Sequence, residues 1–129
     1  MTTNNIPINV QEAEVIQAQL REAGITMKIK LVDSATLLAD GNSKNFETIS
    51  YQWSGRPDPD GNTDQFYRTQ GTSGNWSGIS NPQIDALLDR TREVSSQSER
   101  RKLFSELTKI LHEELPMVFI IHPMSSKTR

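Results

Sequence analysis

The side chains best suited to binding a small molecule lie together at residues 53–58 (WSGRPD). Trp53 ends a predicted strand, and the turn after it carries a glycine, a guanidinium and a carboxylate. A large flat ring beside exposed backbone amides and a fixed cation suits a small polar ligand. A tryptophan packed into the core beneath the loop explains the same composition equally well. The candidate ligand-binding residues are Trp53, Ser54, Gly55, Arg56 and Asp58.

Residues 58–64 (DPDGNTD) have the composition of a calcium loop but not its spacing. A hand-type calcium loop needs glycine at position six and glutamate at position twelve. Counted from Asp58, Gly61 falls at position four and Thr69 at position twelve. The stretch is therefore predicted to be a turn in which aspartate and asparagine side chains accept hydrogen bonds from nearby backbone.

No set of residues predicts catalysis or a bound metal. The two histidines, His112 and His122, are interpreted as a solvent-facing helical residue and a polar residue at a strand end. The chain has no cysteine, no nucleophile elbow and no glycine-rich phosphate loop. We therefore expect no enzyme activity, no cofactor and no metal.

Composition limits the class of protein further. With 129 residues the chain has room for one domain, taken as 1–129, and its net charge of −2 predicts no nucleic-acid partner. No apolar run approaches the roughly 20 residues of a membrane span, so no membrane insertion is expected. Residues 1–9 lack the basic and apolar regions of a signal peptide, which taken alone would indicate a cytoplasmic protein.

Hydrophobic periodicity predicts an α/β domain with helices covering a small sheet. Alternation at residues 25–31 (ITMKIKL) predicts a half-buried strand, and further strands are expected at 46–53 and 117–121. Helices are expected at 10–23, from Asp33 or Ser34 to about Gly41, from Pro82, and from Ser96 to Pro116. The long stretch 54–81 is expected either to have a function or to pack through Phe66, Tyr67 and Trp76.

Four motifs in order resemble one family. They are residues 13–25 (AEVIQAQLREAGI), 51–60 (YQWSGRPDPD), 78–88 (GISNPQIDALL), and 99–104 (ERRKLF) with Leu115-Pro116. They are similar to motifs of the family 5 extracellular solute-binding proteins, which includes the peptide, dipeptide, oligopeptide, nickel and heme binders of ABC importers.

The resemblance implies one lobe of a type II periplasmic-binding-protein-like fold, specifically part of the C-terminal lobe of a larger bilobed protein. It implies a monomer in the periplasm that captures peptides or similar solutes and delivers them to the membrane subunits of a permease. A sensing domain that reuses the lobe, or a small hydrolase, are the alternatives.

Arg56 departs from the family pattern. In the peptide-binding members that the chain resembles, an aspartate after the tryptophan pairs with the amino terminus of the peptide, whereas Asp58 matches a later, structural Asp-Pro pair. A guanidinium repels an ammonium and favours a carboxylate or phosphate. The hypothesis is that this protein does not hold a free peptide amino terminus in that way.

Overall fold

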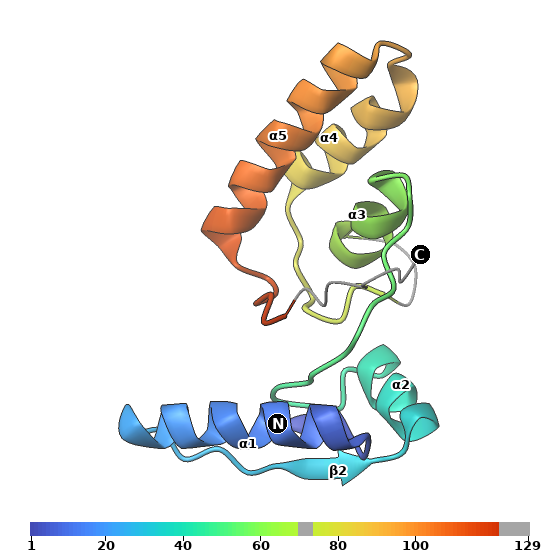
Figure 1. Ribbon diagram of the computed structural model, residues 1–129. Coiled ribbons are helices and arrows are strands. Elements are labelled where there is room, and N and C mark those ends of the chain that lie inside the picture. Colours follow the sequence, from blue (N-terminus) through green and yellow to red (C-terminus); the bar gives the residue numbers. More distant parts are fainter. Residues whose placement is uncertain (70–73, 122–129) are drawn as a thin grey trace, which may run out of the picture.

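The computed structural model describes residues 1–69 and 74–121. The elements follow the order β1 (Thr2–Asn4), α1 (Pro7–Glu22), β2 (Lys30–Val32), α2 (Ser34–Asn42), α3 (Asp60–Tyr67), α4 (Pro82–Glu93) and α5 (Gln97–Glu114). They form two groups: the strands with α1 and α2, and the three helices α3 to α5 (Figure 1). The extended segment 43–59 joins the groups and contains residues 53–58.

The first group is a βαβ unit, in which α1 connects two parallel strands. Thr2 aligns with Lys30 and Asn4 with Val32. A single parallel bridge from Thr2 to Ile49 extends the sheet on the other side of β1. The α/β class is therefore confirmed, with a smaller sheet than expected.

The ends of the helices in this group are set by nearby proline, glycine and aspartate residues. Pro7 occupies the first turn of α1, so the helix starts three residues before its predicted first residue. At its end Gly24 has a φ of +80°, and the N–H groups of Gly24 and Ile25 donate to the carbonyls of Arg21 and Leu20. This pair of bonds is a Schellman motif, which glycine adopts without a Cβ penalty. Asp33 caps α2 through the N–H groups of residues 35 and 36, as predicted.

The second group holds the main hydrophobic core. The predicted apolar stripes of α4 and α5 face each other, and α3 adds Tyr67 to them; the buried members are Tyr67, Ile84, Leu87, Leu88, Leu103 and Leu107. Each fully buried leucine contributes about 1.5–3 kcal/mol. The predicted caps are present, since Asn81 accepts from the N–H of Gln83 and Ser96 from that of Glu99. Helix α3 was not predicted.

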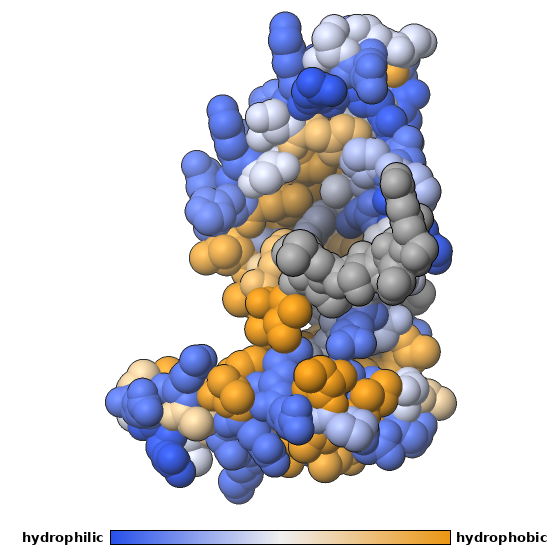
Figure 2. All heavy atoms as spheres, viewed as in Figure 1, coloured by the Kyte–Doolittle hydropathy of each residue, from blue (hydrophilic) through white to orange (hydrophobic). Residues whose placement is uncertain are grey.

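Of the three strand predictions, the first is wrong in extent and the other two are wrong. The expected strand at 25–31 forms only at 30–32, because β1 offers just three residues to pair with. Residues 46–53 contribute only the bridge at Ile49. Residues 117–121 form no strand and are largely exposed, with Val118 77% exposed. Figure 2 shows hydrophobic residues on the surface of both groups and where the two groups meet. Apolar composition alone does not form a strand, because a strand needs a neighbouring strand to pair with its backbone N–H and C=O groups.

Candidate ligand-binding site

Asn62, near the start of α3, organises the turn at residues 53–58. Its Oδ1 accepts from the backbone N–H of Arg56 at 2.7 Å and from the indole Nε1 of Trp53 at 3.1 Å. Its Nδ2 donates to the carbonyls of Arg56 at 2.8 Å and Asp58 at 3.1 Å. The carbonyl oxygen and the NH2 of the Asn62 amide each make two hydrogen bonds, so this one side chain fixes the path of the turn and the edge of the tryptophan ring.

Trp53 is held in place while part of its ring stays accessible. Phe66 of α3 meets the ring edge-on, with centroids 5.0 Å apart. The guanidinium carbon of Arg56 lies 5.0 Å from the ring centroid, within the range of a cation–π interaction. The residue remains 36% exposed. Trp53 is thus neither buried under the loop nor free to rotate in solvent.

Ser54 and Gly55 complete the turn and are both exposed. No hydrogen bond within the described part of the chain engages the backbone N–H of either residue. A Cβ at Gly55 would lie 3.8 Å from Asn62 Oδ1, an ordinary contact. The surface of the turn therefore offers backbone donors beside the aromatic ring and the guanidinium.

Asp58 faces away from that surface and pairs with Arg100 of α5. The two side chains form a bidentate pair with N–O distances of 2.9 and 2.7 Å. The hydrogen bonds from Arg100, with a further one from the N–H of Asp60, lower the pKa of Asp58 to about 2. The Nε of Arg100 also donates to the carbonyl of Thr91, at the last turn of α4. Asp58 thus anchors the turn to α4 and α5 and has little capacity left for a ligand.

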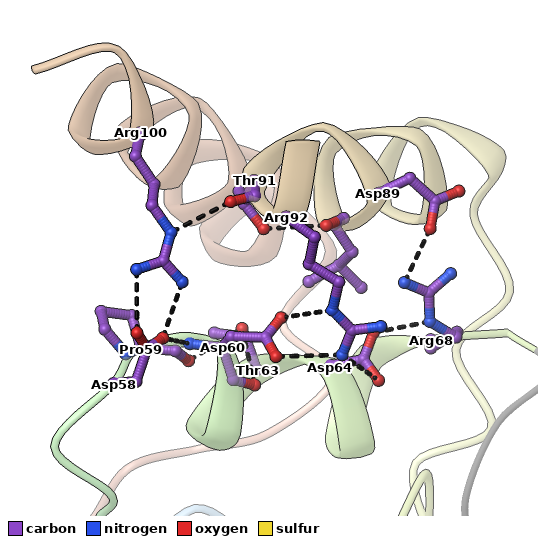
Figure 3. Close-up of polar contacts among 11 residues, drawn as sticks. Asp58, Pro59, Asp60, Thr63, Asp64, Arg68, Asp89, Thr91, Arg92 and Arg100 are labelled. Carbon is purple, nitrogen blue, oxygen red and sulfur yellow. Dashed lines mark hydrogen bonds and ion pairs between the residues drawn. The ribbon is translucent and has the colours of Figure 1, made fainter. Parts of the chain in front are cut away.

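This anchor belongs to a longer series of ion pairs, drawn in Figure 3. Asp60 pairs with Arg92, and Asp64 pairs with both Arg92 and Arg68. Arg68 also lies 2.9 Å from Asp89. Most of these side chains are partly exposed, where a single pair contributes little, but the bidentate geometry and shared partners fix α3 against α4.

The same pairs explain why residues 58–64 do not form a cation site. The carboxylates of Asp58, Asp60 and Asp64 all contact arginines rather than converging on one point. Over residues 1–69 and 74–121, no group of three or more His, Cys, Asp or Glu side chains is arranged to hold a metal ion. His112 is exposed near the end of α5, as predicted, and His122 lies outside the described residues.

The other end of the extended segment is tied to α1. The side chain of Gln52 donates to Asn9 Oδ1 at 2.7 Å, and Asn9 donates to Asn4 Oδ1 at 2.6 Å. Ser50 donates to Glu12 at 3.1 Å. Polar side chains of both groups therefore hold the backbone on either side of Trp53.

The structure places four predicted site residues, Trp53 to Arg56, on one exposed turn. The fifth, Asp58, instead pairs with Arg100 and anchors the turn. Sequence reasoning missed Asn62 and Asn9, because an asparagine in a polar loop carries no signal of which distant groups its amide meets. The turn lies on open surface. A shallow groove elsewhere, between α4 and α5, is lined by Arg90, Lys102 and Glu106 and does not include it.

The fold is that of part of a type II periplasmic binding protein, as comparison with solved structures shows. In the DppA periplasmic binding protein of Helicobacter pylori, solved with the peptide STSA, the equivalent region superposes with a TM-score of 0.82 at 25% identity, over 89% of this chain and 23% of that one. The oligopeptide-binding protein AppA of Bacillus subtilis gives a TM-score of 0.78 at 22% identity and supports the fold alone.

Residues 1–74 match the bacterial extracellular solute-binding proteins, family 5 middle, and the chain belongs to this family. Probable di/tripeptide-binding protein 5 of Pseudomonas aeruginosa is 30% identical over 114 residues, which cover 86% of this chain and 22% of that protein. The peptide transport periplasmic protein SapA of Haemophilus influenzae is 31% identical over 121 residues, covering 87% and 21%.

The chain therefore spans about a fifth to a quarter of the length of these relatives. The matched proteins are binding proteins and not enzymes, which supports the prediction of no catalysis. Among the described residues, no helix combines the length and the apolar character that crossing a bilayer requires. The assignment to the C-terminal lobe and to a single domain stays a prediction.

Proposed function

We propose that this chain is part of the solute-binding component of an ABC importer, which captures peptides or similar small polar solutes in the periplasm and delivers them to the permease. The single observation that carries the proposal is the turn at 53–56. There a half-exposed indole, immobilised by Asn62 and Phe66, stands beside two unengaged backbone N–H groups and a guanidinium.

This arrangement suits binding rather than catalysis. It offers an aromatic surface and hydrogen-bond donors, and it lacks a nucleophile with an adjacent base. The relatives named as peptide-binding and periplasmic proteins support the ligand class and the compartment.

The open position of the turn also fits a two-sided site. A ligand on this surface contacts one side only, so the isolated 129 residues should bind weakly, since association costs translational and rotational freedom whatever the number of contacts. Domain closure around a ligand would supply the opposing contacts in the full-length protein.

The test is native mass spectrometry of the full-length protein that carries these residues, purified without refolding. We expect a co-purified peptide or other small polar solute. An empty protein whose melting temperature does not respond to peptides would contradict the transport proposal and favour the sensing alternative. Turnover of an added peptide would instead favour a hydrolase.

A further inference from the structure

We propose that Arg56 is the anion-binding side chain of this site, that it takes a carboxylate of the ligand, and that Asn62 is the residue that positions it. The inference rests on the proposed function and specifies the chemical group of the ligand that the site recognises.

Among the described residues, no acidic side chain neutralises the charge of Arg56. Arg68, Arg92 and Arg100, on the neighbouring helices, each pair with one or more aspartates. No carboxylate in the described part of the chain pairs with Arg56, which lies on the Trp53 ring instead. Stacking leaves the N–H edge of a planar guanidinium available for a bidentate contact, and a carboxylate fits that edge.

The turn offers donors and no free carboxylate. The backbone N–H groups of Ser54 and Gly55 lie next to Arg56 in the chain, and no hydrogen bond among the described residues engages either of them. The nearest acid in sequence, Asp58, is engaged by Arg100 on both oxygens. A ligand ammonium therefore meets a repulsive charge at this turn, whereas a carboxylate meets two kinds of donor, backbone amides and a guanidinium.

Asn62 fixes where the guanidinium stands. It binds both the N–H and the carbonyl of Arg56, so the backbone of that residue is held on both sides, and it also binds the indole under the guanidinium. Only an amide provides an acceptor and a two-hydrogen donor at these positions. Gly61 keeps space for the stem of the arginine, since a Cβ there would lie 3.1 Å from both Cβ and Cγ of Arg56.

The experiment compares two probes, trialanine and trialanine amide, by isothermal titration calorimetry on the full-length protein. They differ only at the carboxyl terminus, which is a carboxylate in the first and a neutral amide in the second. We expect trialanine to bind about 10- to 100-fold more tightly, the range of one charge-assisted hydrogen-bonded contact. Arg56→Gln should reduce this ratio to near one by weakening trialanine only.

Asn62→Ala should lower the same ratio by a smaller factor. The ratio separates positioning from general loosening, because a loosened turn weakens both probes equally. Two matched controls should leave the ratio unchanged. Arg101→Gln removes an equal charge from an exposed site on α5, and Asn42→Ala removes the equivalent indole-to-amide hydrogen bond from Trp76.

Two results would overturn the proposal, and they are distinguishable. If wild-type protein binds both probes and Arg56→Gln keeps their ratio, Arg56 has no role in carboxylate recognition and the proposed function stands. If wild-type protein binds neither probe, the site does not take the carboxylate of a tripeptide and this inference fails, while native mass spectrometry still tests the proposed function.

Discussion

The two tryptophans share two kinds of contact and differ in the rest of their surroundings. Trp53 and Trp76 each donate the indole N–H to an asparagine, Asn62 and Asn42, at 3.1 and 3.0 Å. Each also meets an aromatic neighbour edge-on at about 5 Å, Phe66 for Trp53 and Tyr51 for Trp76. Both rings are therefore fixed in orientation.

The difference lies in what covers the ring. The face of Trp76 lies on the backbone of α2 at Gly41, so this residue joins the second group of elements to the first. Trp53 carries the charged side chain of Arg56 and keeps part of its surface open. A similar hydrogen bond from the indole to an asparagine is thus found in a tryptophan that packs against α2, Trp76, and in one that keeps part of its ring open, Trp53. The other neighbours of each ring distinguish the two residues.

The largest effect is expected when a methyl group is added under Trp76. A Cβ at Gly41 would lie 2.5 Å from Cε2 of the indole, so the ring must shift in Gly41→Ala. We expect a loss of about 1–3 kcal/mol in the free energy of unfolding, as for overpacking, despite the usual helix preference for alanine. Urea denaturation measures it.

Gly55→Ala is the matched change beside Trp53, where the new Cβ meets only Asn62 at 3.8 Å. It should change the free energy of unfolding by less than about 0.5 kcal/mol, as expected for a surface site. Equal losses in the two variants would contradict the distinction between a packed and a presenting tryptophan.

A smaller effect is expected from Asn42→Ala, which removes the hydrogen bond to Trp76. The expected loss is about 0.5–1.5 kcal/mol, the net contribution of one hydrogen bond. The fluorescence of Trp76 should broaden as its ring gains freedom, while ligand affinity stays unchanged. A weakened affinity in this variant would show that Trp76 belongs to the binding surface.

A further prediction concerns the pH dependence of the anchor of the turn. The pKa of Asp58 in the folded state is about 2, below its ordinary value of 3.8. Because the folded-state pKa is depressed, the contribution of the Asp58–Arg100 pair is present above about pH 4 and is lost as the pH falls through about 2.

Arg100→Gln should return the pKa of Asp58 most of the way to 3.8, leaving only the hydrogen bond from Asp60, and should flatten the dependence of stability between pH 4 and pH 2. NMR titration of the Asp58 carboxyl carbon measures the shift. Since the pair is exposed, added salt should reduce the wild-type shift. A pKa that stays near 2 in the variant would show that Arg100 is not its cause.

Sequence patterns predicted the helices well because their signals are local. Asn81 with Pro82, Ser96 with Glu99, and Gly24 act within one turn of the backbone, and the apolar stripes of α4 and α5 meet as expected. The predictions of strands at 46–53 and 117–121 were wrong, because strand pairing depends on a neighbouring strand that apolar composition does not identify.

The candidate site was predictable in its residues and not in its geometry. Trp53 and Arg56 stood out by type and by their place in a family motif. That their side chains stack, that Asn62 binds them, and that Asp58 turns toward Arg100 42 residues away depend on tertiary contacts. Helix α3 escaped prediction for a related reason: residues 60–67 have a turn-like composition, and their ion pairs to α4 help to stabilise the helix.

The most direct test of the account uses single-tryptophan forms of the full-length protein. Trp76→Phe leaves Trp53 as the reporter at this turn, and Trp53→Phe leaves Trp76; other tryptophans of the full-length protein, if present, are replaced in both. On addition of trialanine, we predict a concentration-dependent change in the fluorescence of Trp53 and none in that of Trp76. A response from Trp76 with a silent Trp53 would contradict the assignment of the ligand surface to residues 53–56.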